Sequence, residues 1–463
     1  MSDATPSDED VVRAARTRLE APGPAPGIAK LLAALREEHG WRLSEKRLKN
    51  LLTTAGLRQE PAQRKPWVPV SSVDESVPLP DGVRAVYFDQ IKGRGLVATK
   101  PFAQGQSLFV EDAFVAAPPP SQLAKLLSGE LCAHCFLPTS GTALALACPA
   151  GGKCHARFCN RICHARAQST HHALLCPGAN PHAEPLLAHL EQYQWHSLHT
   201  VARSLARLLL TASAHPPPSV SPTTGATVHG VATKDAPASF AETLRHLDAF
   251  ATVSELERRA RNPGWAVERS MFLPALKKGW ELLVRALDPR QEKLPRKFPV
   301  QASSFPAAEL DRVLSYDTFL RLLGRANINM ESHGGMYLVH AYLNHDCDPN
   351  VVIRHVPSRG GVRAATRISA QALKPIREGD ELMISYVDPK LPTERRRLLL
   401  WRDYCFGPCQ CQRCLTEQPK TESSEFNAEA ASALAADSKN APVNAADAEA
   451  ASLEQELRAS LGF

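Results

Sequence analysis

The stretch that decides the fold is NHDCDPN at residues 344–350, read together with CQCQRC at residues 409–414. One cysteine, Cys347, lies inside a tight polar segment. Three more follow further along the chain in a Cys-x-Cys-x-x-Cys pattern, namely Cys409, Cys411 and Cys414. A single cysteine and a clustered triplet make a four-sulfur tetrahedral zinc site. Such a site would bring the C-terminal part of the chain back onto the Asn-His segment, and we expect a pocket there.

The composition excludes several classes of protein. The chain has 463 residues, of which 44% are hydrophobic, so it can form sizeable cores in two to four domains. Its first residues are acidic and polar, and no stretch approaches the roughly 18 consecutive apolar residues of a membrane helix. We therefore expect a soluble intracellular protein without a membrane partner. Thiols stay reduced there, so the 12 cysteines point to metal binding rather than to disulfides.

The charge is unevenly distributed. The formal net charge is +6, but residues 415–463 hold nine acidic and three basic residues, a balance of −6, which leaves +12 for residues 1–414. A basic body with an acidic tail suggests an anionic or chromatin-like partner, whereas a solvated surface accounts for most of the charge equally well. Direct binding of nucleic acid is therefore possible, but no feature of the sequence supports it.

Hydrophobic periodicity separates helical from β-rich stretches. It predicts helices within 9–57, 183–212, 240–288 and 305–325, with Ser44 as an N-cap in the first group. The basic face near Lys46 could dock a partner or simply be solvated. Short apolar runs predict strands at 85–88, 95–98, 107–110, 351–353, 363–366 and 382–386. Between the first two strands lies KGRG at 92–95, whose glycines permit close approach of a ligand.

Residues 132–176 hold seven cysteines and one histidine in four ordered pairs. The pairs are Cys132/Cys135, Cys148/Cys154, Cys159/Cys163 and His172/Cys176. Eight ligands make two tetrahedral zinc sites, and a segment this short needs metal in place of a large core. We expect the first and third pairs on one zinc ion and the second and fourth pairs on another. His171 is an alternative to His172 that the sequence leaves open.

This cysteine pattern, with FCNRIC at 158–163, resembles a MYND zinc finger. The family usually has a tryptophan before its histidine, whereas residues 164–171 have none, and the last span here is one residue longer. The resemblance implies a module that binds proline-rich peptides and does no chemistry.

Four motifs occur in the order of a SET methyltransferase domain with its post-SET zinc site: GRG at 93–95, the 344–350 stretch, GDELMISY at 379–386 and the cysteine triplet. With a finger inserted after the first strands, residues 82–414 resemble the SET-and-MYND protein-lysine methyltransferases. They are most similar to the fungal histone-lysine methyltransferase branch, the fifth-numbered of the yeast SET series.

The resemblance implies an α+β fold, a SET β-clip domain split by a finger and a helical insert. Together with periodicity and composition, it divides the chain into a helical module (1–60), a linker (61–82), the first SET part (83–131), the finger (132–176), a helical insert with a disordered part at 215–239 (177–325), the SET core (326–388), the post-SET zinc region (389–414) and an acidic disordered tail (415–463).

Methyl transfer from S-adenosylmethionine to an amine is an in-line displacement, so the site must align the reacting atoms, exclude water and keep the lysine amine neutral. The resemblance assigns the catalytic role to Tyr386 and the lysine channel to Phe406 and Tyr404. It places the cofactor beside Lys92, Gly93, Arg94, Gly95, Asn327, Asn344, His345 and Tyr386. It makes Cys347, Cys409, Cys411 and Cys414 the ligands of a third zinc ion. Asp346 occupies a slot usually held by serine, and its carboxylate could alter cofactor affinity or substrate preference.

Three functions compete at this point. The leading one is methylation of histone tails, most of all histone four, by a monomeric enzyme of the nucleus and cytoplasm that uses S-adenosylmethionine and three zinc ions. The second is methylation of a non-histone cytoplasmic protein. The third is a zinc-finger scaffold or corepressor with a vestigial SET fold, against which the intact Tyr386, Asn344 and His345 argue.

Overall fold

The computed structural model describes residues 6–19, 28–54, 69–218, 237–262, 264–356 and 366–417. The chain divides into two compact units, Met1–Trp67 and Val68–Phe463. Among the described residues, no helix combines the length and the apolar character needed to cross a membrane.

The first unit is a small helical bundle, as the sequence predicts. It consists of α1 (Asp8–Leu19), α2 (Ile28–His39) and α3 (Glu45–Thr54). Ser44 caps α3, because its Oγ accepts the backbone N–H of Arg47 at 3.2 Å. Of the basic residues on α3, Arg47 pairs with Asp8 and Lys49 with Glu45. Carboxylates of the unit itself therefore partly neutralise its basic face.

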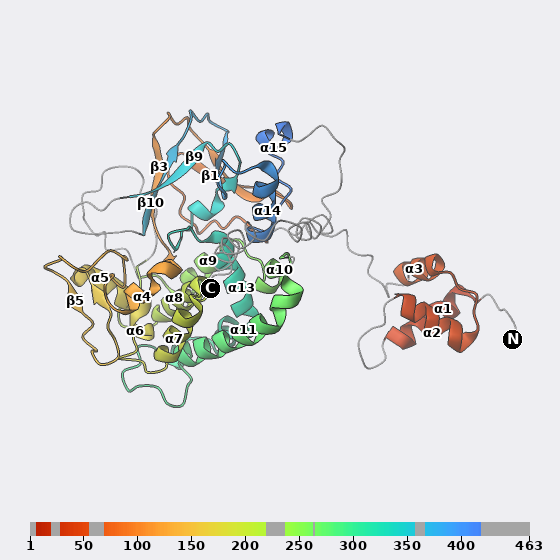
Figure 1. Ribbon diagram of the computed structural model, residues 1–463, viewed down its shortest axis with the longest axis horizontal. Helices are drawn as coiled ribbons and strands as arrows, with labels where there is room; N and C mark the ends of the chain where they lie inside the picture. The colour runs from red at the N-terminus through yellow and green to blue at the C-terminus, as the bar shows by residue number, and fades with distance from the viewer. Residues whose placement is uncertain are drawn as a thin grey trace, which may run out of the picture. The chain divides into compact units, whose positions relative to one another are not determined.

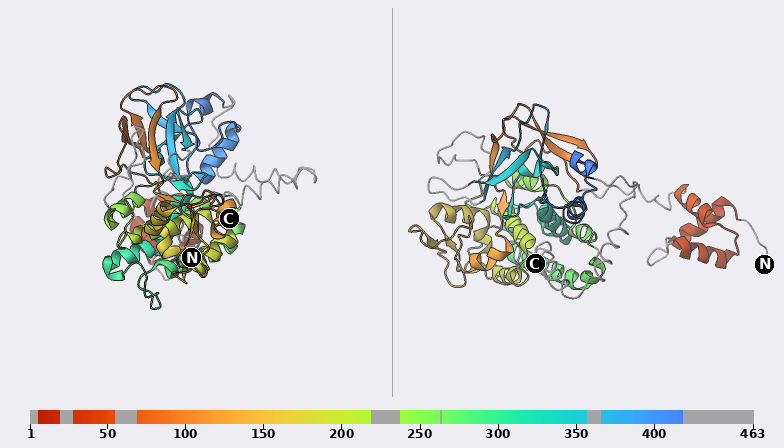
Figure 2. Two further views of the ribbon diagram at one scale, coloured as in Figure 1. Left: turned by 90° about the vertical axis from the view of Figure 1, so that its left-hand side faces the viewer. Right: turned by 45° about the horizontal axis from the view of Figure 1, so that its top comes forward.

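The second unit combines β-sheets with a helical block (Figures 1 and 2). One sheet has the order β1-β2-β11-β8 and another the order β3-β10-β9, with short pairs β4-β7 and β5-β6. Strand β11 runs antiparallel to β2 but parallel to β8, so it joins the 344–350 stretch to the first hairpin. The strands are β1 (Val83–Asp89), β2 (Gly93–Ala98), β3 (Ser107–Asp112), β4 (Val115–Ala116), β5 (Leu146–Ala147), β6 (Arg157–Phe158), β7 (Gly335–Met336), β8 (Asn344–His345), β9 (Val351–His355), β10 (Arg367–Ala372) and β11 (Glu381–Ile384).

The helical block packs around α8, which is buried along almost its whole length and contacts α7, α9, α11 and α13. A helix that is apolar or satisfied on all sides belongs inside a core rather than at a surface. The helices of this unit are α4 (Pro120–Leu127), α5 (Arg161–Ala167), α6 (Ala173–Leu175), α7 (Ala183–Tyr193), α8 (His196–Leu210), α9 (Phe240–Asp248), α10 (Glu255–Arg259), α11 (Trp265–Leu287), α12 (Ala307–Leu314), α13 (Tyr316–Asn329), α14 (Thr393–Asp403) and α15 (Gln412–Thr416), with 3₁₀ turns η2 (Ala302–Ser304) and η3 (His340–Tyr342).

Residues 132–176, called here the finger segment, contain a π-helical turn, η1 (Gln168–His172), between α5 and α6. A π-helical turn accommodates one extra residue in an α-helix. Figure 1 shows this segment at the edge of the helical block, and η1 contacts α8.

One expectation differs from the structure. Residues 69–82, expected within a linker, belong to the second unit: Val70 forms a β-bridge with Thr252, and Val77 is buried. Proline-rich backbone without regular structure can still be fixed in this way through side-chain burial and isolated hydrogen bonds. The strand expected at 363–366 falls largely outside the described residues, and the strand observed there, β10, begins at Arg367. Most of the two stretches expected to be disordered, 215–239 and 415–463, also lies outside the described residues.

Candidate active site and metal centres

A cavity of about 390 Å³ opens where the hairpin β1-β2, the end of α13, η3, β8 and β11 meet. Of the residues proposed for the cofactor and substrate, the structure brings together here Lys92, Arg94, Asn344, His345, Tyr386, Tyr404 and Phe406. These residues come from distant parts of the chain, and the pairing of β11 with both β2 and β8 is what joins them.

Asn344 connects the two sides of the cavity. Its Nδ2 donates to the backbone carbonyl of Arg94 at 2.8 Å and to Glu381 Oε1 at 3.0 Å. Gly95 makes this approach possible: a Cβ there would lie 2.7 Å from Asn344 Nδ2 and 2.7 Å from a ring carbon of Phe88. Gly95 therefore shapes the wall of the cavity without lining it, and a Cβ on Gly93 would clash with Oγ of Ser71, which does line the cavity.

The two basic residues of the KGRG turn have different roles. Lys92 pairs with Glu381 at the rim. The Arg94 side chain is buried, stacks 3.6 Å above the ring of Tyr342 and donates to backbone carbonyls, including that of Ser72 at 3.0 Å. Burial lowers the pKa of Arg94 to about 10, so the guanidinium stays charged. Its side chain thus fixes the hairpin.

Tyr386 lies just after β11 with its hydroxyl fixed. The hydroxyl donates to the backbone carbonyl of Leu343 at 2.7 Å, and the backbone N–H of Tyr386 donates to His345 Nδ1 at 3.0 Å. Burial lowers the pKa of His345 to about 4, so its ring is neutral and Nδ1 can accept. Burial raises the pKa of Tyr386, which keeps its hydroxyl protonated.

Aromatic rings close this end of the cavity. The ring of Tyr386 lies 4.8 Å from that of Tyr404 and 6.1 Å from that of Phe406, measured between centroids. His345 completes the group at 5.7 Å from Phe406. An apolar aromatic enclosure disfavours a charged amine inside it.

The structure does not bring Asn327 to the cavity. Its Nδ2 donates to Glu255 Oε2 at 2.8 Å, in a buried ion-pair group on α10. Asn329 lines the cavity instead, with Nδ2 donating to the carbonyls of Ala251 and Arg325. Two positions on a helix are about 200° apart, so a shift of two residues places the side chain on the opposite face.

Asp346, whose carboxylate could alter cofactor affinity or substrate preference, is not among the described residues that line the cavity. Its Oδ1 accepts the backbone N–H of Asp348 at 2.8 Å, and its own N–H donates to Ile384 O at 2.9 Å. These two hydrogen bonds hold Asp346 beside Asp348 and strand β11.

Behind the aromatic rings lies a cluster of Cys347, Cys409, Cys411 and Cys414, whose sulfur atoms all lie within 4.8 Å of one another. Buried Arg396 of α14 faces this cluster: its Nε donates to Cys347 Sγ at 3.2 Å and its Nη2 to Cys414 Sγ at 3.6 Å. Cys405 lies outside the cluster, as expected. The four sulfurs could hold a metal ion, and the arginine offers a positive charge to them.

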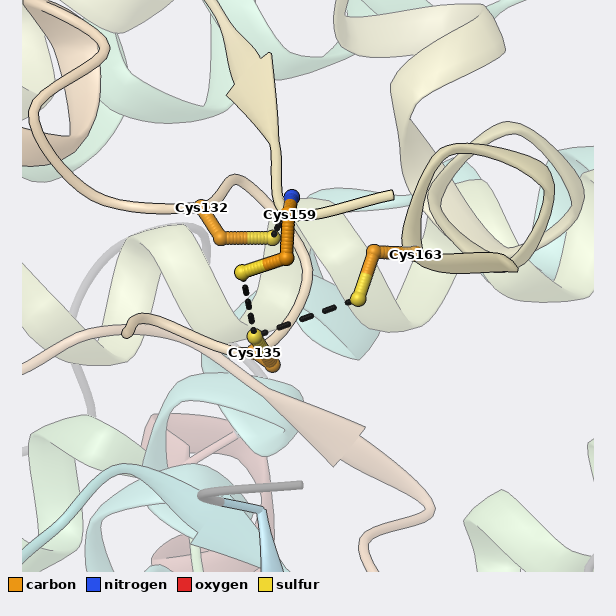
Figure 3. A group of neighbouring side chains, drawn as sticks. All are labelled: Cys132, Cys135, Cys159 and Cys163. Carbon is orange, nitrogen blue, oxygen red and sulfur yellow. Dashed lines mark hydrogen bonds between the residues drawn. The ribbon is translucent and has the colours of Figure 1, made fainter. Parts of the chain in front are cut away.

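The finger segment forms two further clusters in the expected interleaved arrangement. Cys132, Cys135, Cys159 and Cys163 turn their sulfur atoms toward one another (Figure 3), with 3.6 Å between those of Cys135 and Cys159. Neighbouring sulfurs of a tetrahedral zinc site, with Zn–S bonds of about 2.3 Å, lie about 3.8 Å apart. The spacing therefore suits a zinc ion.

The second finger cluster decides between the two histidines. Cys148, Cys154, His172 and Cys176 form the group, and His172 Nε2 lies 3.3 Å from Cys148 Sγ. His171 Nε2 instead lies 3.2 Å from the backbone carbonyl of Ala133. His172 is thus the side chain that faces the sulfurs.

Sequence reasoning missed several residues of these sites. Glu331, His340 and Asn329 line the cavity, and Arg396 faces the sulfur cluster. None of them stands in a recognisable motif, and single polar residues near a helix end carry no signal of their own. Only the contact between distant segments identifies them.

Comparison with known proteins places these sites in context. The SET domain family matches residues 93–387. "Histone-lysine N-methyltransferase SET5" of Mycosarcoma maydis is 39% identical over 456 residues, covering 89% of this chain and 89% of the relative. The protein of the same name from Yarrowia lipolytica is 28% identical, covering 85% of this chain and 78% of the relative. Among solved structures, the SET domain of LSMT bound to lysine and AdoHcy is 12% identical with a TM-score of 0.27, covering 72% of this chain and 54% of that chain.

Proposed function

This chain belongs to the SET-domain family and, within it, to the fungal SET5 branch, and from that premise we propose that it transfers methyl groups from S-adenosylmethionine to lysine side chains of histone tails. A histone substrate would place the protein in the nucleus, at chromatin. The name of its relatives supports histones over other proteins.

One observation carries the proposal. The Tyr386 hydroxyl and the Leu343 carbonyl meet at 2.7 Å beside the Asn344–His345 strand, inside a cavity bounded by Tyr404 and Phe406. Methyl transfer needs oxygen atoms that attract the polarised methyl group without capturing it, and an enclosure that favours a neutral amine. This group of residues offers both.

The cavity suits S-adenosylmethionine, which when bound supplies the methyl group. Its volume lies in the range of small-ligand sites, and it combines apolar walls with a few fixed polar groups. We assign the backbone at Arg94, together with Asn344 and His345, to the adenosine and amino-acid ends. Tyr386 would then position the methyl group and the amine, while Tyr404 and Phe406 form the lysine channel.

We further propose that the three sulfur clusters each hold one zinc ion, and that residues 132–176 form a MYND-type finger. The interleaved grouping and the sulfur spacing support this assignment. In this proposal the finger binds a proline-rich peptide, and the third cluster anchors the channel residues that precede Cys409.

Methyl transfer from radiolabelled S-adenosylmethionine to core histones, recombinant nucleosomes and whole-cell extract tests the proposal. We expect label in a histone band, most of all histone four. Label confined to non-histone bands would move the substrate to another protein. The absence of any label despite cofactor binding would favour a scaffold role.

Replacing Gly95 with alanine is expected to weaken cofactor binding about tenfold or more, because the new Cβ would displace Asn344. Calorimetric titration with S-adenosylhomocysteine measures the effect. Gly105→Ala is the matched control: Gly105 has φ +80° and nothing within 4 Å of an added Cβ, so that variant should lose stability but not cofactor affinity. Unchanged affinity in Gly95→Ala would contradict the assignment.

Replacing Arg396 with methionine is expected to weaken zinc binding at one of the three clusters by 10–100-fold, about the usual effect of removing an outer-shell hydrogen-bond donor. Four thiolates around Zn²⁺ leave two net negative charges, and the buried guanidinium offsets part of them. Competition with a chromophoric chelator should release one zinc ion early. Arg395→Met, on the neighbouring position, should release zinc as the wild type does.

A further inference from the structure

A single carboxylate, Glu331, stands among the described residues that line the active-site cavity. The lining also contains one lysine and one arginine, and each has partners of its own. Lys92 pairs with Glu381, and Arg94 donates to backbone carbonyls. Glu331 is therefore the residue of this lining whose side chain can carry a negative charge, in a site whose proposed substrate is cationic.

Both backbone polar groups of Glu331 form hydrogen bonds within a tight turn. Its backbone N–H donates to Gly335 O at 2.9 Å, and Gly334 N–H donates back to Glu331 O at 2.7 Å. Gly334 has φ +94°, and a Cβ there would lie 1.7 Å from the carbonyl of Ala117, so this tight turn requires glycine.

The side chain of Glu331 is anchored as well. Its Oε1 lies 2.7 Å from Nε2 of His340, whose side chain is 8% exposed, against 23% for Glu331. The backbone N–H of His340 donates in turn to Glu111 Oε2 at 3.0 Å, from strand β3. This contact restricts the conformations of the carboxylate before any ligand arrives.

The carboxylate is ionised near neutral pH. Burial would raise its pKa, but His340, His355 and the backbone N–H of Ser332 together hold the pKa of Glu331 below its ordinary value. Glu331 and Tyr404 line the same cavity, and burial together with the charge of Glu331 raises the pKa of Tyr404. A cation that enters this cavity therefore meets a negative charge.

We propose that Glu331 binds the side-chain ammonium of the target lysine as it enters the cavity, before the amine loses its proton. This inference rests on the proposed function and names the residue that selects a cationic side chain. Because the contact forms with the protonated lysine, it contributes to substrate binding rather than to the rate of the chemical step. Glu331 is a specificity-determining residue in this scheme.

The test measures binding of histone four tail peptides in the presence of S-adenosylhomocysteine, for wild type and Glu331→Gln. Each peptide carries one lysine replaced by norleucine, which is similar in shape and uncharged. For the peptide in which the target lysine is replaced, the ratio of the norleucine Kd to the lysine Kd should fall about tenfold on going from wild type to Glu331→Gln. Comparing four Kd values in this way isolates the pairwise contact.

Steady-state kinetics give a second readout. Glu331→Gln should raise the peptide KM about tenfold, leave kcat within about threefold and reduce the dependence of KM on salt, since screening weakens an ion pair. Glu378→Gln, an exposed acid outside the cavity lining, makes the same change in net charge and should behave as wild type. Glu331→Asp, which keeps the charge, should recover part of the loss.

Three results would overturn the inference. The first is an unchanged Kd ratio, and the second is a lower kcat with an unchanged peptide KM. The third is weaker binding of S-adenosylmethionine alone, which would assign Glu331 to the ammonium of the cofactor.

Failure of the proposed function would give a different result. In that case the Kd ratio would depend on Glu331 while the wild type transferred no methyl group, and the lysine contact would stand without the activity.

Discussion

Replacing Tyr386 with phenylalanine is expected to lower kcat by about 10²- to 10³-fold, the usual loss when one preorganised polar group is removed from a transition state. The Tyr386 hydroxyl donates to Leu343 O at 2.7 Å, which leaves its lone pairs for the transferring methyl group. Phenylalanine keeps the ring contacts with Tyr404 and Phe406, so the channel should keep its shape.

The measurement is steady-state methyl transfer at saturating cofactor and peptide, with the melting temperature and the cofactor affinity of each variant recorded beside it. Tyr316→Phe is the matched control, because Tyr316 opens α13 outside the cavity lining and loses the same hydroxyl. A kcat within threefold of wild type in Tyr386→Phe would remove Tyr386 from the catalytic role.

Metal-ligand spacing was the most predictive part of the sequence. The interleaved arrangement expected for the four pairs groups Cys132 with Cys159 and Cys148 with Cys176, and the structure has both groups. Tetrahedral coordination demands a fixed number of ligands at short spacing, so few arrangements satisfy it. The choice between His171 and His172 needed the structure, because adjacent residues in a π-helical turn differ only in direction.

The polar residues of the cavity were less predictable. Asn344, His345 and Tyr386 stand in motifs that resemble those of the SET family, and all three line the cavity. Asn327 was misplaced because the sequence does not fix which face of α13 meets the cavity. Glu331 was not identified at all, since its position depends on a tight turn at Gly334 and on contact with His340, both of which are tertiary features.

The same limit applies to segments without periodicity. Residues 69–82 have the composition of a linker, yet Asp74 donates its backbone N–H to the hydroxyl of Tyr342 at 3.2 Å, and Pro69 and Ser71 line the cavity. Composition describes how a segment behaves alone, whereas its place in the fold depends on partners distant in sequence.

Replacing Cys409 with serine is expected to reduce the zinc content from three ions to two per chain and to lower methyl transfer at least about 100-fold. Removing a ligand forfeits much of the binding free energy of a structural zinc site, which is about 10–16 kcal/mol. Cys409 lies three residues after Phe406, and both Tyr404 and Phe406 donate their backbone N–H to Leu400 O at 3.2 Å. Without the metal these contacts alone would have to hold the channel.

Elemental analysis gives the zinc content, and peptide KM and kcat give the effect on the channel. Cys405→Ser is the control for zinc content, because Cys405 is buried but lies outside the three sulfur clusters, and it should keep all three ions. The finger clusters should keep their metal in Cys409→Ser, since they share no ligand with the third cluster.

Loss of one zinc ion with full activity would show that packing of α14, rather than the metal, positions Tyr404 and Phe406. Retention of three ions would mean that Cys409 is not a ligand.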